Sequence, residues 1–277
     1  MTILKIDDKN EIYYEFVKPK DNGFTFVFVN ALTGNVSAWN GEIGQLVVGQ
    51  GNGYLTYNFR GQEISKFDER LDLDTEIIVS DLCLLIDELK IQNIVLVGLS
   101  IGGLYATLAL EKGIKSKGLV LINTLRKNNT RLRWINETMV NVARYGGTSL
   151  LMDFNMPVIA SPRFLEQMKS KALNPNNYIR LEETSGIFKL MQGSLSANWD
   201  LDWSKINVPV LIMTGHHDKV FRVPSDIDDI IKTIKEGSEL GTRGVRTGHR
   251  GVQSGYSRGP NWEPEGSKVG TRGAQDG

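Results

Sequence analysis

One serine lies in a pattern that could do chemistry. Ser100 is the centre of Gly98-Leu99-Ser100-Ile101-Gly102, directly after the apolar run 94–97. A β-branched run that breaks into Gly-x-Ser-x-Gly predicts a strand, a tight turn that exposes the serine, and a helix. Glycines are needed around such a turn because side chains would collide there. The N-terminus of the helix that follows would carry free N–H groups, which suit a developing oxyanion.

The elements that must position this serine alternate along the chain. The predicted strands cover residues 12–17, 24–29, 54–59, 94–97, 118–123 and 210–214. A helix is predicted over Thr75–Leu89, with Asp74 as its N-cap, because apolar residues recur there at helical spacing. Strands that alternate with helices indicate an α/β fold with a mostly parallel sheet flanked by helices.

A long insertion separates the last two predicted strands. Residues 125–205 have helical patterning, clearest at Trp134–Ala143, and little strand signal. An insertion after one strand and before the next would lie at the carboxyl edge of the sheet, so we predict a helical lid over Ser100. The predicted domains are then a core of residues 1–124 and 206–236 and a lid of residues 125–205.

Charged and aromatic residues of the predicted lid have two interpretations each. Arg126 and Lys127 begin a basic cluster that fits a solvated surface better than a site for a carboxylate-bearing substrate. Trp134, Trp199 and Trp203 fit a role in holding the lid on the core slightly better than a role in lining an acyl pocket.

The end of the chain differs in composition from the rest. Residues 237–277 contain eleven glycines, and no Leu, Ile, Phe or Met follows Leu240. Such a stretch cannot bury much apolar area, so we predict a disordered tail and a fold whose last strand and helix are missing or disordered. A frameshift, a chimeric read or a foreign fusion after about residue 240 would each produce this switch.

Four local motifs resemble those of the α/β-hydrolase fold, in its lid-bearing branch that acts on small molecules, over about residues 13–235. The first is the Ser100 turn. The second, Asn30–Gly34 with Trp39 downstream, resembles the oxyanion loop of enol-lactone hydrolases and some acyltransferases. The third, Asn58–Ser65, resembles the Asp-x-Arg-Gly-x-Gly-x-Ser loop of the family. The fourth, Val208–Asp218, resembles the strand and turn that carry the catalytic acid.

The third motif departs from the family pattern at Asn58 and Glu63. The order and spacing of the four motifs together nevertheless imply this fold.

The resemblance implies a role for each site residue. Ser100 would be the nucleophile and Asp218 the acid that orients the base. The N–H of Ile101, the residue after the nucleophile, and that of Leu32 would hold the oxyanion.

The base is harder to assign because the chain has three histidines. His216 and His217 adjoin Asp218 on the same turn, so they are poorly placed to lie between it and Ser100. His249 follows a glycine and comes after the acid, where the family has its base. The residues around it lack the strand and helix of the family, so His249 is either the true base or a coincidence of the altered ending.

The predicted function is hydrolysis of a small carboxylic ester or lactone through an acyl-serine intermediate. Acyl transfer and carbon–carbon bond hydrolysis on the same framework are alternatives, since the lid selects the bond and the acceptor. A binding protein with an impaired triad is a third. A serine rather than an aspartate at position 100 excludes dehalogenase and epoxide-hydrolase chemistry.

Composition excludes several other classes. The formal net charge is zero, so neither nucleic acid nor an anionic membrane is expected as a partner. No phosphate-binding or dinucleotide-binding glycine motif and no cluster with metal-ligand spacing is found, so no cofactor or metal is predicted. We see no signal peptide or membrane-spanning run, which predicts a cytoplasmic protein.

Overall fold

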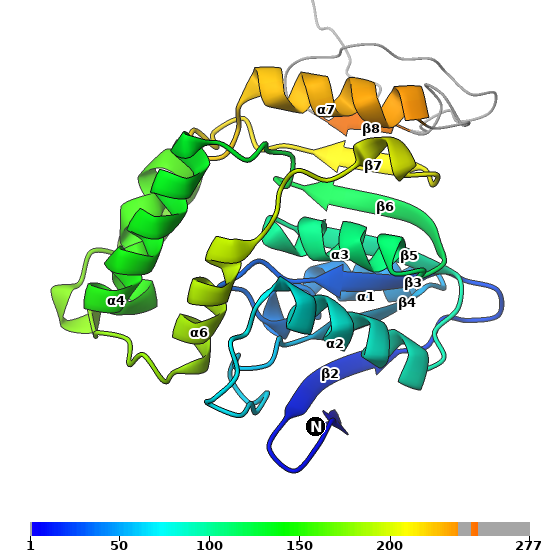
Figure 1. The fold of residues 1–277 in the computed structure, drawn as a ribbon, viewed down its shortest axis with the longest axis horizontal. Coiled ribbons are helices and arrows are strands. Elements are labelled where there is room, and N and C mark those ends of the chain that lie inside the picture. Colours follow the sequence, from blue (N-terminus) through cyan, green and yellow to red (C-terminus); the bar gives the residue numbers. More distant parts are fainter. Residues whose placement is uncertain (1, 238–244, 249–277) are drawn as a thin grey trace, which may run out of the picture.

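The computed structural model describes residues 2–237 and 245–248. Its centre is an eight-stranded sheet with the spatial order β1-β2-β4-β3-β5-β6-β7-β8 (Figure 1). The strands are β1 (Thr2–Lys5), β2 (Glu11–Val17), β3 (Thr25–Val29), β4 (Gly53–Tyr57), β5 (Ile94–Leu99), β6 (Ser116–Ile122), β7 (Val210–Met213) and β8 (Val245–Gly248). The β1–β2 and β2–β4 pairs are antiparallel and the others are parallel. The predicted α/β fold with a mostly parallel sheet is confirmed.

The predicted ending needs one correction. Val245–Gly248 form β8, which pairs in parallel with β7 from Val210 to Met213. The prediction was a last strand and helix that are missing or disordered, because this stretch has no strand periodicity. A four-residue strand needs little periodicity when an adjacent strand offers unpaired backbone groups. The remaining tail residues, 238–244 and 249–277, lie outside the described residues.

Helices cover both faces of the sheet. On one face α2 (Thr75–Glu88), α3 (Ile101–Glu111) and α7 (Pro224–Gly237) pack on the main hydrophobic cluster (Figure 1). The other face is packed by α1 (Glu42–Gly49), in a second cluster around Phe28, Trp39 and Tyr54. Alternate residues of β3 and β5 enter the two clusters, as expected for strands buried on both faces.

Local signals explain where these elements begin. The Asp74 carboxylate accepts the N–H of Ile77 at 3.0 Å and so caps α2, as predicted. In α7, Ile227, Ile230 and Ile234 recur at helical spacing and are all buried. The six predicted strands match β2 to β7 within a few residues, whereas β1, α1 and α7 were not predicted.

The segment between β6 and β7 is helical, as predicted for the lid. It contains α4 (Thr130–Ile159), α5 (Pro162–Met168) and α6 (Gly186–Gly193), and α4 and α6 lie beyond one end of the sheet (Figure 1). Gly147, at φ 69° and ψ −172°, interrupts α4 with a kink. A small hydrophobic cluster that includes Val140 and Phe188 joins α4 to α6.

Membrane-spanning character is absent from the described helices. None of the helices within residues 2–237 combines the length and the apolar composition that a bilayer crossing requires.

Candidate active site

Ser100 lies at the turn between β5 and α3, as the motif predicted. Its backbone has φ 57° and ψ −121°, a left-handed conformation that side-chain-bearing residues rarely adopt. Its N–H donates to the Ile122 carbonyl oxygen at 2.8 Å, which ties the turn to the end of β6. The serine is half-buried, and its side chain does not cap the helix that follows.

The glycines of the motif are required by close backbone approaches. A methyl group on Gly98 would overlap the backbone of Gly103, and one on Gly102 would overlap the Val29 and Asn30 carbonyls. A methyl group on Gly103 would overlap the Thr124 side chain. The turn is therefore packed against β3 and the end of β6 without space for side chains.

Asp218 lies in the turn after β7 and is buried. Its Oδ1 accepts the N–H groups of Val220 at 3.0 Å and Phe221 at 2.8 Å, so the carboxylate is fixed from one side. The start of this turn is held by Asn123, whose Oδ1 accepts the N–H of Gly215 at 2.6 Å. The end of β6 thus contacts both the Ser100 turn, through Ile122, and the turn that carries Asp218, through Asn123.

The predicted oxyanion residues lie on two firmly held segments. Ile101 is the first residue of α3, where an N–H has no acceptor within its own helix. The loop that contains Leu32 is anchored by Asn30, which donates to the Tyr57 carbonyl oxygen and accepts the Trp39 indole N–H, both at 2.6 Å. Trp39 in turn stacks on Phe28 with 4.6 Å between ring centroids.

The loop 58–65 supports the same region. The Gln62 side chain donates to the Leu32 carbonyl oxygen at 2.9 Å, and Asn58 accepts the N–H of Val36 at 3.0 Å. Arg60 forms a buried ion pair with Asp81 of α2, in which its Nε donates at 2.8 Å. Burial raises the pKa of Asp81, and the Arg60 charge opposes that shift. The loop therefore supports the Leu32 segment, and Asn58 acts in it as a hydrogen-bond acceptor.

Arg126 is the unexpected member of the site. Its Nη2 donates to Ser100 Oγ at 3.2 Å, and the side chain is only 5% exposed. The guanidinium lies between the rings of Trp199 and Phe221, at 4.4 Å and 4.2 Å from their centroids. Burial lowers the pKa of Arg126 to about 10, and the negative charge of Asp218 opposes this shift. Arg126 is therefore a cation at neutral pH, placed next to the serine and within the field of the acid.

One protein-family model matches this chain. The model described as "Alpha/beta hydrolase family" matches residues 26–254, most of the chain. The chain belongs to the alpha/beta hydrolase family.

Solved structures have the same fold as this alpha/beta hydrolase. MGS-M2, an alpha/beta hydrolase enzyme from a Medee basin deep-sea metagenome library, is 21% identical, with a TM-score of 0.72 over 89% of this chain and 88% of that one. The esterase EaEST from Exiguobacterium antarcticum is 19% identical, with a TM-score of 0.68 over 89% and 90%. The enol-lactonase from Burkholderia xenovorans LB400 is 21% identical, with a TM-score of 0.66 over 86% and 87%. No curated protein matches the chain.

The histidines of this alpha/beta hydrolase fall into two groups. His216 and His217 are exposed, and their rings meet edge to face at 5.6 Å. His249 lies outside the described residues. The residue before it, Gly248, is the last of β8 and pairs with Met213 at the carboxyl end of β7.

The prediction of a solvated surface for the basic cluster at the start of the lid is wrong for Arg126. Arg131 and Arg133 are exposed, as expected of a solvated surface, but Arg126 is buried beside Ser100. Its place directly after β6, four residues beyond the strand end at Ile122, was the available signal. Of the three lid tryptophans, Trp199 stacks on Arg126, Trp203 joins the main core, and Trp134 is 75% exposed.

The lid also contacts the loop of the acid. The N–H of Lys219 donates to the Val158 carbonyl oxygen near the end of α4 at 2.8 Å. The Arg131 guanidinium, near the start of the same helix, donates to the Lys219 carbonyl oxygen at 3.2 Å.

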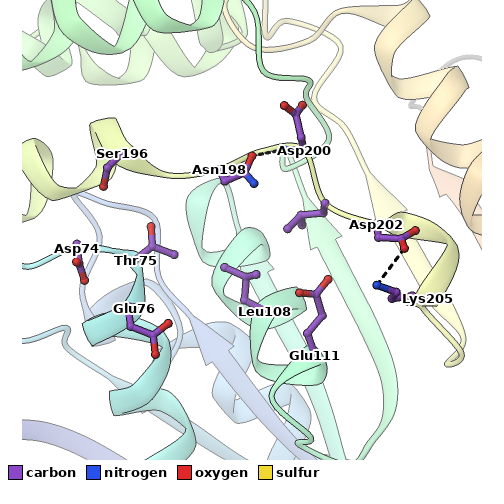
Figure 2. Close-up of a pocket in the computed structure, with 11 residues that line it drawn as sticks. Asp74, Thr75, Glu76, Leu108, Glu111, Ser196, Asn198, Asp200, Asp202 and Lys205 are labelled. Carbon is purple, nitrogen blue, oxygen red and sulfur yellow. Dashed lines mark hydrogen bonds and ion pairs between the residues drawn. The ribbon is translucent and has the colours of Figure 1, made fainter.

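A separate surface hollow of about 410 Å³ lies away from the serine (Figure 2). It is formed in part by Leu108 and Glu111 at the far end of α3 from Ser100, and by Asp74 and Glu76 at the start of α2. Its charged lining residues are five carboxylates and one lysine, Lys205. Within the described part of the chain, no group of three or more His, Cys, Asp or Glu residues is arranged to hold a metal ion.

Proposed function

We propose that this alpha/beta hydrolase cleaves a small carboxylic ester or lactone through an acyl-serine intermediate. The observation that carries the proposal is the Ser100 backbone, held at φ 57° between β5 and the N-terminus of α3. Strained residues of this kind persist only where the surrounding structure enforces them, and they gather at active sites.

The reaction begins with attack of Ser100 Oγ on the ester carbonyl carbon. The base accepts the serine proton, and the carbonyl oxygen becomes an oxyanion that the N–H groups of Ile101 and Leu32 stabilise. The carbonyl re-forms as the bond to the alcohol oxygen breaks, and the base returns its proton to that oxygen. Water then attacks the acyl-serine in the same way, which releases the acid and the free serine.

We assign the base to His249 and its orientation to Asp218. The support for His249 is its position directly after β8, whose last residue pairs with the end of β7. The support for Asp218 is its burial and its fixed Oδ1, which leaves Oδ2 for the imidazole.

One observation favours a second candidate, a binding protein with an impaired triad. The hydroxyl of Ser100 accepts a hydrogen bond from Arg126, which draws electron density from the atom that should attack. In that case the protein would bind an ester without turning it over.

A burst experiment with p-nitrophenyl acetate on the full chain separates these functions. Steady turnover that is lost in Ser100→Ala supports the hydrolase. One equivalent of p-nitrophenol without turnover supports the impaired triad, and no release supports a binding protein without an activated serine. The intact mass after a fluorophosphonate probe checks the site, since an adduct on the native chain and none on Ser100→Ala identifies the nucleophile.

A further inference from the structure

Arg126 is a buried cation with only neutral partners among the described residues. Its Nε donates to the Thr124 carbonyl oxygen at 3.1 Å, and its Nη2 donates to the Asn123 carbonyl oxygen at 2.7 Å and to Ser100 Oγ at 3.2 Å. The ion pairs within 4.0 Å among residues 2–237 and 245–248 do not include Arg126, and the Asp218 carboxylate acts on it from a longer distance. A buried charge without a directly paired opposite charge is costly, and a bound anionic ligand would offset that cost.

The other buried arginine of the described chain shows the usual solution. Arg60 is paired with Asp81, through hydrogen bonds from both Nε and Nη2. Arg126 has no such directly paired carboxylate among the described residues, and Asp218 acts on it only at longer range. Its environment therefore leaves a direct partner position for an anion from outside those residues.

The geometry of the guanidinium shows where such an anion would bind. An arginine has five N–H donors in a planar fork. The three contacts above use Nε and both hydrogens of Nη2, so the two hydrogens of Nη1 have no acceptor in the described structure. The Trp199 and Phe221 rings both pack against the guanidinium carbon, so the unused Nη1 hydrogens are the donors that remain for a ligand.

We propose that Arg126 binds a carboxylate of the substrate, so that the preferred substrate is an ester or lactone with a free carboxylate a few bonds from the reacting carbonyl. This inference rests on the proposed hydrolase function, because Ser100 marks where the carbonyl lies. A carboxylate fits the planar fork and balances the buried charge. Arg126 is thus a specificity-determining residue, beside the nucleophile but distinct from the triad.

The first test compares two p-nitrophenyl esters of similar size, p-nitrophenyl butyrate and mono-p-nitrophenyl succinate. The native chain is expected to prefer the anionic ester in kcat/KM. Arg126→Gln should lower the ratio of the two kcat/KM values by roughly 10- to 100-fold, the range of a charged hydrogen bond. Arg126→Lys keeps the charge without the fork and should lose less. Arg133→Gln, at an exposed arginine of the same segment, should leave the ratio unchanged.

The second test does not depend on turnover. Trp199 stacks on Arg126, so succinate monomethyl ester should change the tryptophan fluorescence of Ser100→Ala, whereas methyl butyrate should not. The change should be lost in Ser100→Ala/Arg126→Gln. If Arg126→Gln fails to fold, the same two esters are compared on Ser100→Ala and on Ser100→Ala/Arg126→Lys. The fluorescence change with succinate monomethyl ester should then be smaller in the double variant.

The two tests separate the two proposals. Anion binding that depends on Arg126 without turnover would refute the hydrolase and support the anion site. Turnover with equal kcat/KM for both p-nitrophenyl esters in the native chain, or an unchanged ratio in Arg126→Gln, would overturn the anion site and leave the hydrolase standing.

Discussion

At the scale of single residues, the Ser100 turn depends on the absence of side chains around it. Three glycines let β3, β5 and the start of α3 approach so closely that no Cβ atom fits. The strain of the serine backbone, which typically costs about 1–3 kcal/mol, is offset by the packing that these glycines permit.

Gly102→Ala should therefore destabilise the protein. Its methyl group would overlap the carbonyls of Val29 and Asn30, and we expect a loss of about 1–3 kcal/mol in the free energy of unfolding, measured by urea titration. The control is Gly49→Ala in α1, where a Cβ meets nothing within 4 Å. That change should be neutral or stabilising by up to about 1 kcal/mol. Equal effects of the two substitutions would argue against the close approach.

The assignment of the base is tested by the histidines. His249→Ala should reduce kcat for p-nitrophenyl acetate by about a million-fold, the loss seen when a triad histidine is removed from a serine protease. His216→Ala removes an exposed imidazole next to Asp218 and should retain full activity. If His249→Ala keeps the native kcat, His249 is not the base.

Ser100 and Arg126 show what sequence could and could not reveal at this scale. The place of Ser100 in a turn between a strand and a helix was predictable, because the close backbone approaches of that turn require glycines at fixed spacing, which are visible in one chain. The role of Arg126 was not, because a basic residue in a basic cluster carries no local sign of burial. Its aromatic neighbours Trp199 and Phe221 are distant in sequence, and only the tertiary fold brings them to it.

At the scale of elements, the segment after β3 is fixed by one buried amide. Asn30 bridges Tyr57 of β4 and Trp39, and its side chain has no exposed surface. The main chain of Leu32, two residues later, depends on that anchor for its position.

Asn30→Ala should affect both stability and catalysis. It leaves the Trp39 N–H and the Tyr57 carbonyl without their partner, at a cost of about 1–3 kcal/mol in urea unfolding. Displacement of the Leu32 N–H should lower kcat for p-nitrophenyl acetate by about 10- to 100-fold with little change in KM. Asn207→Ala, at an exposed asparagine that precedes β7, should change neither quantity. A normal kcat in Asn30→Ala would refute the link between this anchor and the oxyanion donor.

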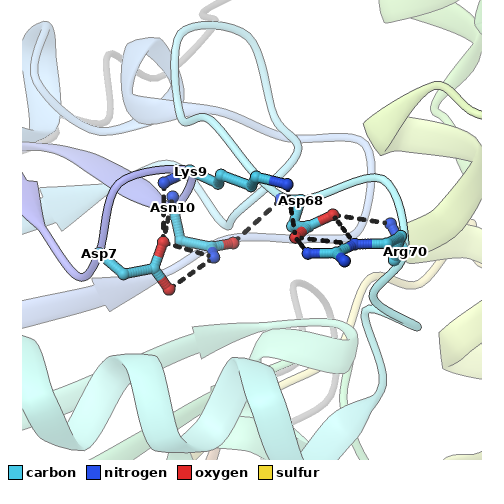
Figure 3. Close-up of polar contacts among 5 residues, drawn as sticks. All are labelled: Asp7, Lys9, Asn10, Asp68 and Arg70. Atoms are coloured by element: carbon cyan, nitrogen blue, oxygen red, sulfur yellow. Dashed lines mark hydrogen bonds and ion pairs between the residues drawn. The ribbon is translucent and has the colours of Figure 1, made fainter.

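The turn between β1 and β2 and the loop around Asp68 are joined by polar contacts (Figure 3). Asp68 accepts the Arg70 Nε at 3.0 Å and lies 3.5 Å from Lys9 Nζ. Hydrogen bonds from the Arg70 side chain and backbone lower the pKa of Asp68 well below 3.8. Asp7 also has a lowered pKa, chiefly because it accepts the N–H of Lys9.

These shifts predict an acid-sensitive contribution to stability. A carboxyl whose pKa is lower in the folded state stabilises the fold above its unfolded pKa, near 4, and loses that effect as the pH falls toward the folded value. Asp68→Asn should therefore lower the unfolding temperature at pH 7 and reduce the difference between pH 7 and pH 3. Asp8→Asn, an exposed carboxylate of the same turn, serves as the control. An unchanged difference in Asp68→Asn would show that this contact does not contribute.

Sequence patterns predict some elements of this fold and miss others. Buried parallel strands such as β3 and β5 are continuous apolar runs and were found readily. The strand β8 carries no such run, and it is defined by its pairing with β7 rather than by its own residues. At the kink of α4, a Cβ on Gly147 would overlap the Ile179 carbonyl oxygen, and this close approach of two distant segments is not visible in the sequence.

At the scale of the whole molecule, the two faces of the sheet are covered unequally near β7. Val210 and Ile212 are buried beneath α7, whereas Leu211 and Met213, which alternate with them, are 36% and 43% exposed. Exposed apolar side chains on a strand favour association between copies of a protein.

Leu211→Thr/Met213→Thr should therefore reduce self-association. We expect the double variant to keep the native unfolding temperature within a few degrees and to show less light scattering at high protein concentration. Leu46→Thr, at a 64% exposed residue of α1, is the control and should scatter as the native chain does. Unchanged scattering in the double variant would show that this strand face is not the origin of association.

The hydrogen bond between Lys219 and Val158 has a consequence for how a ligand reaches the serine. Gly147 divides α4 into two halves, and only the second half is bonded through Val158 to the loop that carries Asp218. Outward motion of the second half of α4 would therefore pull on the loop that carries Asp218. Motion of the first half would strain only the longer hydrogen bond from Arg131 to the Lys219 carbonyl oxygen. The two halves of α4 thus contact the Asp218 loop differently, and the shorter hydrogen bond belongs to the half that follows Gly147.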